Sequence, residues 1–330
     1  MPQCLFKIVL SLLIVCACFS EAVWGGDSEN RQPQPTGPWF TGTLLSTRGL
    51  TLDQGRVVVE PYFFFTRYGG LYNDNWRLQS ATVSHTIIQQ TYFIYGVTNR
   101  IDVEIAPQWL QNSAGGESIS GFGDFPIQLG FQVLKSRADS WLPDVRIWAQ
   151  EIFPSGQYND LRPSIRGLGG TGGGSFATTL GIGVQKAIRL GHHQVFRYRV
   201  NATYGFYSPV TVQGFNSYGG GFGTDGRVEP GSVTTLTVAG EYSLTRQLVL
   251  ALDIGFQTIN ATSFSGTTGV DVNGEQAIVG RGYGDLLTIA PALEYNFTEH
   301  VGLITGPWLS LRGKNTSEFF GVVAALYLYM

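Results

Sequence analysis

Four histidines, His85, His192, His193 and His300, are the residues best suited to acid–base or metal chemistry in this chain. Of these, only His85 lies beside a nucleophile, Ser84, and neighbouring residues of a strand point their side chains to opposite faces. That pair therefore cannot form the hydrogen-bonded dyad of a hydrolase. His192 and His193 are two adjacent ligands without a third, which favours a solvated turn over a metal site. We expect no catalysis, no metal and no cofactor.

Nine charged residues form a second candidate site, because each falls on the polar face of a segment whose other face is apolar. They are Glu60, Asp102, Glu104, Arg146, Arg197, Arg199, Glu241, Asp253 and Glu294. A ring of such charges inside a pore could set its selectivity for ions or solutes. Alternatively, the charges pair with one another and fill the bore, since an unpaired buried charge is costly unless it is hydrated. Both signs are present, which favours pairing.

The segments that carry these charges alternate between apolar and polar residues. In residues 248–257, Leu248 and every second residue after it are apolar, and Asp253 lies on the other face. In residues 195–206, large apolar residues alternate with polar ones that include Arg197 and Arg199. A period of two predicts β-strands. An apolar face opposite a charged one is typical of a membrane barrel, with lipid outside and a polar lumen inside.

About twelve such strands are predicted. They lie near residues 56–68, 79–95, 101–111, 123–134, 144–153, 175–189, 194–207, 233–244, 247–258, 285–297, 301–311 and 317–330. These segments are long compared with globular strands, which average about 5–6 residues, whereas a tilted strand needs about 9–11 residues to cross a bilayer. The predicted fold class is therefore all-β: a transmembrane, antiparallel, up-and-down β-barrel of residues 55–330. A soluble β-sandwich is the alternative that this pattern disfavours.

Short and long connections alternate between the predicted strands. The short ones fall at residues 96–100, 135–143, 190–193, 245–246 and 298–300, and the longer, glycine-rich ones at 69–78, 112–122, 154–174, 208–231 and 259–284. Outer-membrane barrels place short turns in the periplasm and long loops outside the cell. A chain that starts and ends in the periplasm needs an even number of strands, which twelve satisfies. The long loops are rich in glycine and poor in charge, which predicts mobile segments better than a rigid docking surface.

A tyrosine followed three residues later by a threonine occurs at three of the short connections, beginning at Tyr95, Tyr242 and Tyr295. We interpret each repeat as a periplasmic hairpin turn. The tyrosine ends a strand in the aromatic girdle of the barrel, and the threonine and the polar residues after it form the turn.

A second repeat, Gly-Phe/Tyr-Gly-Asp, occurs at residues 121–124 and 282–285. Both copies precede a predicted strand. The apolar faces of these two strands fall on opposite parities after the aspartate. A bulge or a shift of register is therefore expected in one of them.

Residues 1–22 are predicted to be a cleaved export signal. Lys7 precedes an apolar run at residues 8–19, and Ser20 and Ala22 have the spacing that signal peptidase requires. The run is shorter than the roughly 20 apolar residues that span a bilayer as a helix. All three cysteines lie in this segment, so the rest of the chain has no disulfide and no cysteine-ligated metal. We expect the protein in the outer membrane of a Gram-negative cell.

The two ends of the predicted barrel carry further expectations. Residues 23–54 are an irregular periplasmic lead or an arm inside the lumen, and the apolar Trp39, Phe40, Leu44 and Leu45 favour an anchored arm. The C-terminal strand is expected to be read by the barrel-assembly machinery, although such signals usually end on Phe and this chain ends Tyr-Met. Membrane lipid and a small solute are the other expected partners. The formal charge of −3 argues against nucleic acid.

Several motifs, taken in order, resemble those of one family. They are P-W-F-T-G-T-L-L at residues 38–45, E-P-Y-F-F-F at 60–65, the two Gly-Phe/Tyr-Gly-Asp motifs, F-P-S-G-Q-Y at 153–158, T-G-G-G-S-F at 171–176 and G-F-N-S-Y-G-G-G-F-G-T at 214–224. Together they are similar to the "MetA-pathway of phenol degradation" family of outer-membrane transporters. The resemblance implies a barrel that passes small organic compounds, aromatic ones among them. It assigns no substrate and no functional residue.

The sequence therefore favours an outer-membrane channel for small molecules, hydrophobic or aromatic ones included. The alternative is a closed barrel that displays its extracellular loops for adhesion or surface structure. A barrel hydrolase would need a histidine near the extracellular rim, and none is found there.

Overall fold

The computed structural model describes residues 37–136, 140–165, 169–191 and 194–330. Apart from Gly37, these residues belong to the unit Pro38–Met330. The predicted signal peptide, with all three cysteines, lies outside the described residues, as do His192 and His193.

Strands dominate the described residues. Their bounds are β1 Val57–Tyr72, β2 Leu78–Thr98, β3 Ile101–Ile105, β4 Gln108–Ala114, β5 Glu117–Phe122, β6 Phe125–Leu134, β7 Asp144–Phe153, β8 Ala177–Arg189, β9 Val195–Tyr207, β10 Val210–Gln213, β11 Asp225–Glu229, β12 Val233–Ser243, β13 Leu248–Ile259, β14 Ser263–Thr267, β15 Gly284–Asn296, β16 Val301–Lys314 and β17 Thr316–Tyr329. A short 3-10 helix, η1, covers Pro163–Ile165. No helix in the described part is long and apolar enough to cross a membrane.

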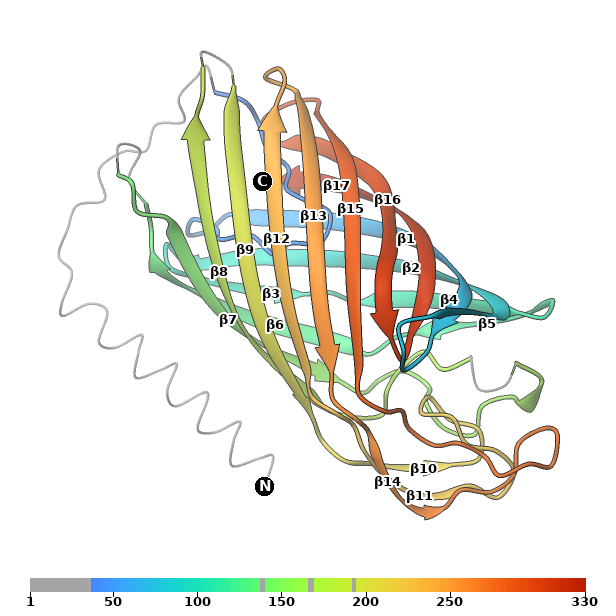
Figure 1. Cartoon of the computed structure of the whole chain (residues 1–330). Helices are drawn as coiled ribbons and strands as arrows, with labels where there is room; N and C mark the ends of the chain where they lie inside the picture. The colour runs from blue at the N-terminus through green and yellow to red at the C-terminus, as the bar shows by residue number, and fades with distance from the viewer. Residues whose placement is uncertain (1–36, 137–139, 166–168, 192–193) are drawn as a thin grey trace. The chain divides into compact units, whose positions relative to one another are not determined.

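Fourteen of these strands form one antiparallel sheet that closes on itself (Figure 1). Neighbours follow the order β1-β17-β16-β15-β13-β12-β9-β8-β7-β6-β3-β2, and β2 pairs with β1 to close the ring. β3 and β4 are two parts of one crossing, as are β5 and β6, so the barrel has twelve strands. The predicted antiparallel barrel of about twelve strands is confirmed.

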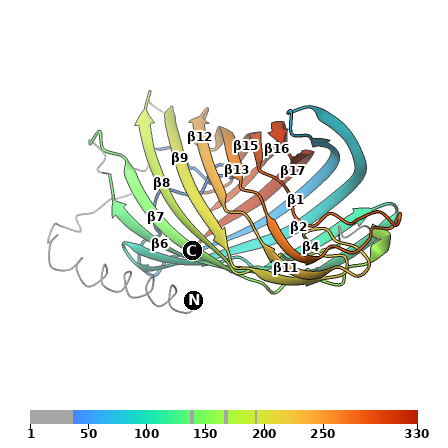
Figure 2. The ribbon, with the colours of Figure 1, turned by 60° about the horizontal axis from the view of Figure 1, so that its bottom comes forward.

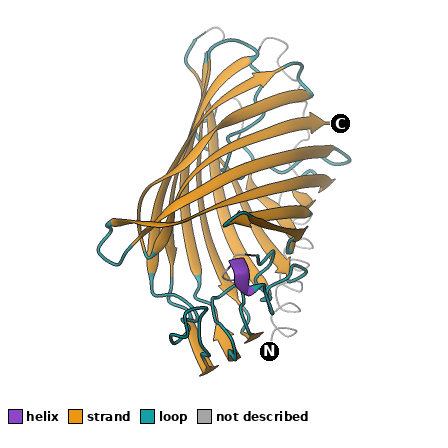
Figure 3. Cartoon of the chain, turned by 90° about the vertical axis from the view of Figure 1, so that its right-hand side faces the viewer, coloured by secondary structure: helices purple, strands orange, loops and turns teal. Residues whose placement is uncertain are grey.

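A second, three-stranded sheet of β10, β11 and β14 forms within two of the long connections. This sheet and η1 gather at one end of the barrel, opposite the end that carries the short turns (Figure 3). Figure 2, in which the loop end is turned forward, shows β11 in front of the barrel strands. The two ends of the barrel therefore differ as an outer-membrane barrel requires, with short turns at one and folded loops at the other.

The barrel wall has an apolar outer face and a largely polar inner face. On β13, Leu250, Leu252, Ile254 and Phe256 are 39–45% exposed, whereas the intervening Asp253 is fully buried. Because side chains of a strand alternate between its faces, the exposed set points out and the buried set points into the lumen. The outer surface is thus suited to lipid.

The three tyrosine–threonine repeats lie at hairpin turns of the short-turn end, as predicted. The hydroxyl oxygen of Thr98 accepts a hydrogen bond from the N–H of Arg100 at 3.1 Å. Thr245 and Thr298 each accept two such bonds, from the second and third residues after them, at 2.9–3.2 Å. The threonine therefore satisfies backbone donors that the turn would otherwise leave unpaired.

Two predicted long loops, residues 69–78 and 112–122, are mostly strand instead. The β1–β2 ladder continues until Tyr72 pairs with Leu78, and the β4–β5 turn is only Gly115 and Gly116, both with positive φ. The prediction was wrong because it required an apolar face. A ladder above the lipid needs only its backbone hydrogen bonds, so polar and glycine-rich residues can continue it.

The two aspartates of the Gly-Phe/Tyr-Gly-Asp repeats face opposite ways. β5 ends at Phe122 and β6 begins at Phe125, so the strand is interrupted between them. Asp124 lies on the inward parity of β6, and Asp285 lies on the outward parity of β15. The expected irregularity is therefore at residues 123–124.

Candidate functional site

All nine predicted charged residues lie on the inward face of the barrel wall. Asp102, Arg146, Glu241, Asp253 and Glu294 are completely buried. Their strands bring them together near the short-turn end, within two clusters and along the segment between them. Residues 38–55, which we call the arm, precede β1 and connect these clusters (the dark-blue coil in Figure 1).

The first cluster centres on Asp102 of β3. Arg146 Nη2 of β7 donates to Asp102 Oδ1 at 2.7 Å, and both side chains are completely buried. Arg48 of the arm places its Nη2 3.6 Å from Asp102 Oδ2 and 3.7 Å from Glu104 Oε2. Gly130 of β6 leaves room for this pair, because a Cβ there would overlap both Arg146 and Asp102. The charges are thus balanced between the wall and the arm.

The second cluster centres on Glu241 of β12. Arg197 of β9 donates from Nε and Nη2 to the two Glu241 oxygens, at 2.5 Å each. Arg199 Nε lies 3.6 Å from Glu241 Oε2. A bidentate pair fixes both planes, so this guanidinium is held rigidly. It also lies 4.3 Å from the ring centroid of Phe40 of the arm, a cation–π contact.

The arm has no regular structure, and inward side chains satisfy its backbone. N–H groups of the arm donate to carboxylate or amide oxygens of Glu294, Asp253, Gln185, Gln132 and Asp102. Carbonyl groups of the arm accept from Arg199, Asn201, Gln132 and Asn296. Buried backbone groups need such partners, so the polar wall and the irregular arm fit each other.

Apolar contacts add to this attachment. Leu44 is buried against inward residues of β13, β15, β16 and β17, among them Ile304 and Val323. Leu52 packs with Val58 and Ile94. The arm therefore joins a small core inside the barrel, where its leucines are removed from water.

Glu60 differs from the other eight predicted residues. In the part of the chain that the structure describes, it makes no hydrogen bond and no ion pair. The amides Gln128, Gln132, Gln185 and Asn296 line the same lumen and were not predicted, because only charged residues were considered. Their inward parity in the sequence was the signal that could have identified them.

The loop end of the barrel is also organised by an inward carboxylate. Asp124 accepts hydrogen bonds from the N–H groups of Gly156 and Gly173, at 2.9 and 2.7 Å. Asn112 donates to the carbonyl of Gly170 at 2.9 Å. The 154–176 connection is thus attached to inward side chains of the wall.

The long loops bond to one another as well. Ser217 N–H donates to the Tyr158 carbonyl at 2.9 Å, and Gly280 N–H to the Tyr218 carbonyl at 2.7 Å. Burial raises the pKa of Tyr218 above its ordinary value, so its hydroxyl remains a donor, to the Gly173 carbonyl at 2.8 Å. The expectation of mobile loops is therefore wrong for the described residues. Glycine lets backbones approach closely, as at Gly221, where a Cβ would overlap the Val270 carbonyl.

Neither a catalytic nor a metal-binding arrangement is found in the residues described. His85 stacks on Phe65 on the outer face, with ring centroids 5.8 Å apart. His300 lies in a short turn, stacked on Tyr329. No group of three or more His, Cys, Asp or Glu suited to a metal ion occurs among them.

Comparisons with known proteins show the fold. No family model matches the chain, and no curated protein matches it. The crystal structure of an outer-membrane channel from Pseudomonas putida F1 superposes with a TM-score of 0.63 at 16% identity, covering 86% of this chain and 99% of that one. More remote are the β domain of the Bordetella autotransporter BrkA (TM-score 0.46, 8% identity, 84% and 100% covered) and the NanC porin (0.43, 9%, 82% and 98%). The chain is therefore similar in fold to an outer-membrane channel.

Proposed function

We propose that the protein is an outer-membrane channel that passes small molecules, hydrophobic or aromatic ones included, through its lumen in a Gram-negative cell. The observation that carries this proposal is that part of the lumen is occupied by a separate segment, the arm. Barrels of about eight strands are filled by their own side chains, whereas 16–18 strands leave an aqueous channel. A twelve-stranded barrel holding an irregular segment has a bore that opens when the segment moves.

The charged residues serve this function by holding the arm. Asp253 and Glu294 bind arm N–H groups directly, and Arg197 contacts Phe40. The lumen is therefore closed at the periplasmic end by contacts that are polar and reversible. Once the arm has moved, the same side chains are exposed to the bore and set its selectivity.

An aromatic stretch of the inner wall supports a hydrophobic solute. Phe64 of β1, Trp308 of β16 and Phe319 of β17 are inward, with ring centroids 6.5 Å and 4.7 Å apart along the series. Trp308 Nε1 is buried without a hydrogen-bond partner in the described residues. Aromatic faces bind apolar and aromatic molecules, and a free indole N–H suits a solute oxygen. The resemblance to the phenol-degradation transporters agrees with this substrate class.

Display of the loops remains a second candidate function, because they form an ordered surface. Phe222 and Ile278, in two bonded loops, are 54% and 81% exposed. Such apolar exposure is typical of an interaction surface. Recognition of β17 by the barrel-assembly machinery also stays a prediction.

Single-channel recording in planar bilayers tests the channel proposal. A variant lacking residues 38–54 is expected to give stepwise current, and toluene is expected to interrupt it. The double variant Phe64→Ala with Trp308→Ala should conduct equally but respond less to toluene. A folded, arm-deleted barrel that carries no current would refute the channel and favour loop display.

A further inference from the structure

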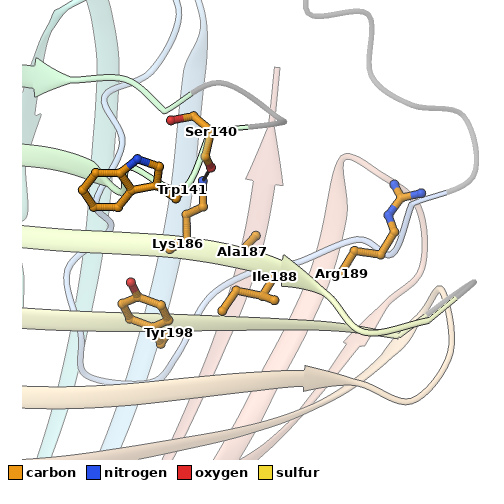
Figure 4. Close-up of a pocket in the computed structure, with 7 residues that line it drawn as sticks. All are labelled: Ser140, Trp141, Lys186, Ala187, Ile188, Arg189 and Tyr198. Carbon is orange, nitrogen blue, oxygen red and sulfur yellow. Dashed lines mark hydrogen bonds between the residues drawn. The ribbon is translucent and has the colours of Figure 1, made fainter.

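The connection between β6 and β7 folds over the outer wall of the barrel and forms a groove at the short-turn end (Figure 4). This rim groove has a volume of about 440 Å³ and is lined by residues that include Trp141, Lys186, Ile188 and Tyr198. Lys186 and Ile188 lie on the outward parity of β8, since Gln185 between the strands' inner side chains is buried, and Tyr198 pairs with Lys186 across β8 and β9. The groove therefore faces lipid, not the lumen.

A lysine without an anionic partner lies in the groove. Lys186 Nζ donates to Ser136 Oγ at 2.6 Å, to the Leu142 carbonyl at 2.9 Å and to the Ser140 carbonyl. All three acceptors are neutral, and no carboxylate of the described residues lies within salt-bridge distance of Lys186. Figure 4 shows Lys186 extending from β8 toward Ser140. A cation on the lipid face is costly without an anion nearby.

The groove lies at the depth of lipid headgroups. Ile188 pairs with Phe196, which pairs with Tyr242, a residue of the aromatic turn repeats. Trp141 is 85% exposed, the largest exposure among the large apolar residues of the described chain, and Tyr198 lies beside Lys186. Trp and Tyr prefer the membrane–water interface, where one end of the ring is apolar and the other wet. The neighbouring outer face of β8 is apolar, with Leu180 and Ile182 exposed.

We propose that the rim groove binds a phospholipid of the periplasmic leaflet by its phosphodiester headgroup. Lys186 lies beside the phosphate, Trp141 and Tyr198 contact the glycerol region, and an acyl chain follows Ile182 and Leu180 along β8. The cation selects the phosphate, and the apolar wall distinguishes a lipid from a free anion. The inference rests on the membrane placement of the proposed function but not on transport, so a silent channel leaves it standing.

Native mass spectrometry of the protein released from nanodiscs of phosphatidylglycerol and phosphatidylethanolamine tests this site. The wild-type protein is expected to retain one phospholipid more tightly than the rest. Lys186→Gln should lower the retained fraction about tenfold, the loss expected for one charge-assisted contact. Lys186→Arg should retain the lipid, and Lys314→Gln, which removes the same charge at the other rim, should not affect it. Equal retention by Lys186→Gln and the wild type would overturn the proposal.

Two further measurements separate the alternatives. Displacement of the lipid by glycerol phosphate at equal concentration would show a small-anion site and overturn the lipid assignment. If Lys186→Gln does not fold, a photoactivatable phosphatidylglycerol can be crosslinked to the wild-type protein. Crosslinks concentrated on peptides containing Trp141 or Ile188 support the groove, and crosslinks spread evenly around the periplasmic rim refute it.

Discussion

Asp253 of the barrel wall binds Ser46 of the arm twice, through the Ser46 N–H at 3.1 Å and the Ser46 hydroxyl at 2.7 Å. The two residues are 207 positions apart in the chain, and both are buried. A wall carboxylate that binds the backbone of an irregular segment explains how a charged lumen and an unstructured arm coexist. It also identifies the contact to disrupt first.

Asp253→Ala is expected to loosen the arm. The variant loses the bonds to Ser46 and one to Leu45 N–H, and hydrogen bonds to a charged group contribute roughly 1.5–3 kcal/mol each. Single-channel current should rise several-fold, and protease added from the periplasmic side should cleave within residues 38–55. Asp285→Ala, at the opposite rim and on the outer face, is the matched control and should behave as wild type. An unchanged current and an uncut arm in Asp253→Ala would show that this carboxylate does not hold the segment.

Arg146→Met is expected to destabilise the barrel. It leaves Asp102 buried without its shortest ionic contact, and breaking a buried pair by removing one partner costs about 3–5 kcal/mol. Urea unfolding of the refolded protein measures this loss. The double variant Arg146→Met with Asp102→Leu removes both charges and should recover most of the stability. A single variant as stable as the wild type would mean that water already hydrates this pair.

Thr298→Val is expected to weaken one periplasmic turn. The hydroxyl accepts from His300 and Val301 N–H groups, and a typical hydrogen bond contributes about 1 kcal/mol net. Urea unfolding should therefore show a loss of about 1–2 kcal/mol, and Thr298→Ser, which retains the hydroxyl, should lose less. If the serine variant falls as far as the valine variant, the turn depends on the methyl group instead.

Asp124→Ala is expected to release the 154–176 connection from the wall while leaving the barrel folded. Both Gly156 and Gly173 lose their acceptor. Hydrogen exchange at these amides should accelerate, and the strands should stay protected. Asp124→Asn keeps one acceptor oxygen and should fall between. Unchanged exchange in Asp124→Ala would place the attachment of this connection in its other contacts, such as that of Asn112 with Gly170.

The barrel could be predicted from the sequence because lipid imposes a period of two on every crossing. Leu250 and Ile254 had to face out, which placed Asp253 inside. The same argument placed all nine charges in the lumen. It failed at residues 69–78 and 112–122, where the strands leave the lipid and the constraint ends.

The arm contacts and the loop assembly could not be predicted in the same way. The arm has no period, because its backbone bonds to side chains and not to a neighbouring strand. Nothing local in Ser46 indicates that it meets Asp253. The glycines of the loops were interpreted as flexibility, whereas Gly156 and Gly173 permit close approach to Asp124.

The central claim is that the arm closes the lumen and that the channel opens when it leaves, and a reversible crosslink tests this most directly. A Cβ at Gly302 would lie 3.3 Å from the Thr41 Cβ, close to the separation of about 3.5–4.5 Å in disulfides. Thr41→Cys with Gly302→Cys, placed in the Asp253→Ala background, should therefore lock the arm when oxidised. Single-channel current is predicted to be low in the oxidised protein and to rise several-fold on reduction. An oxidised protein that conducts as well as the reduced one would contradict the account.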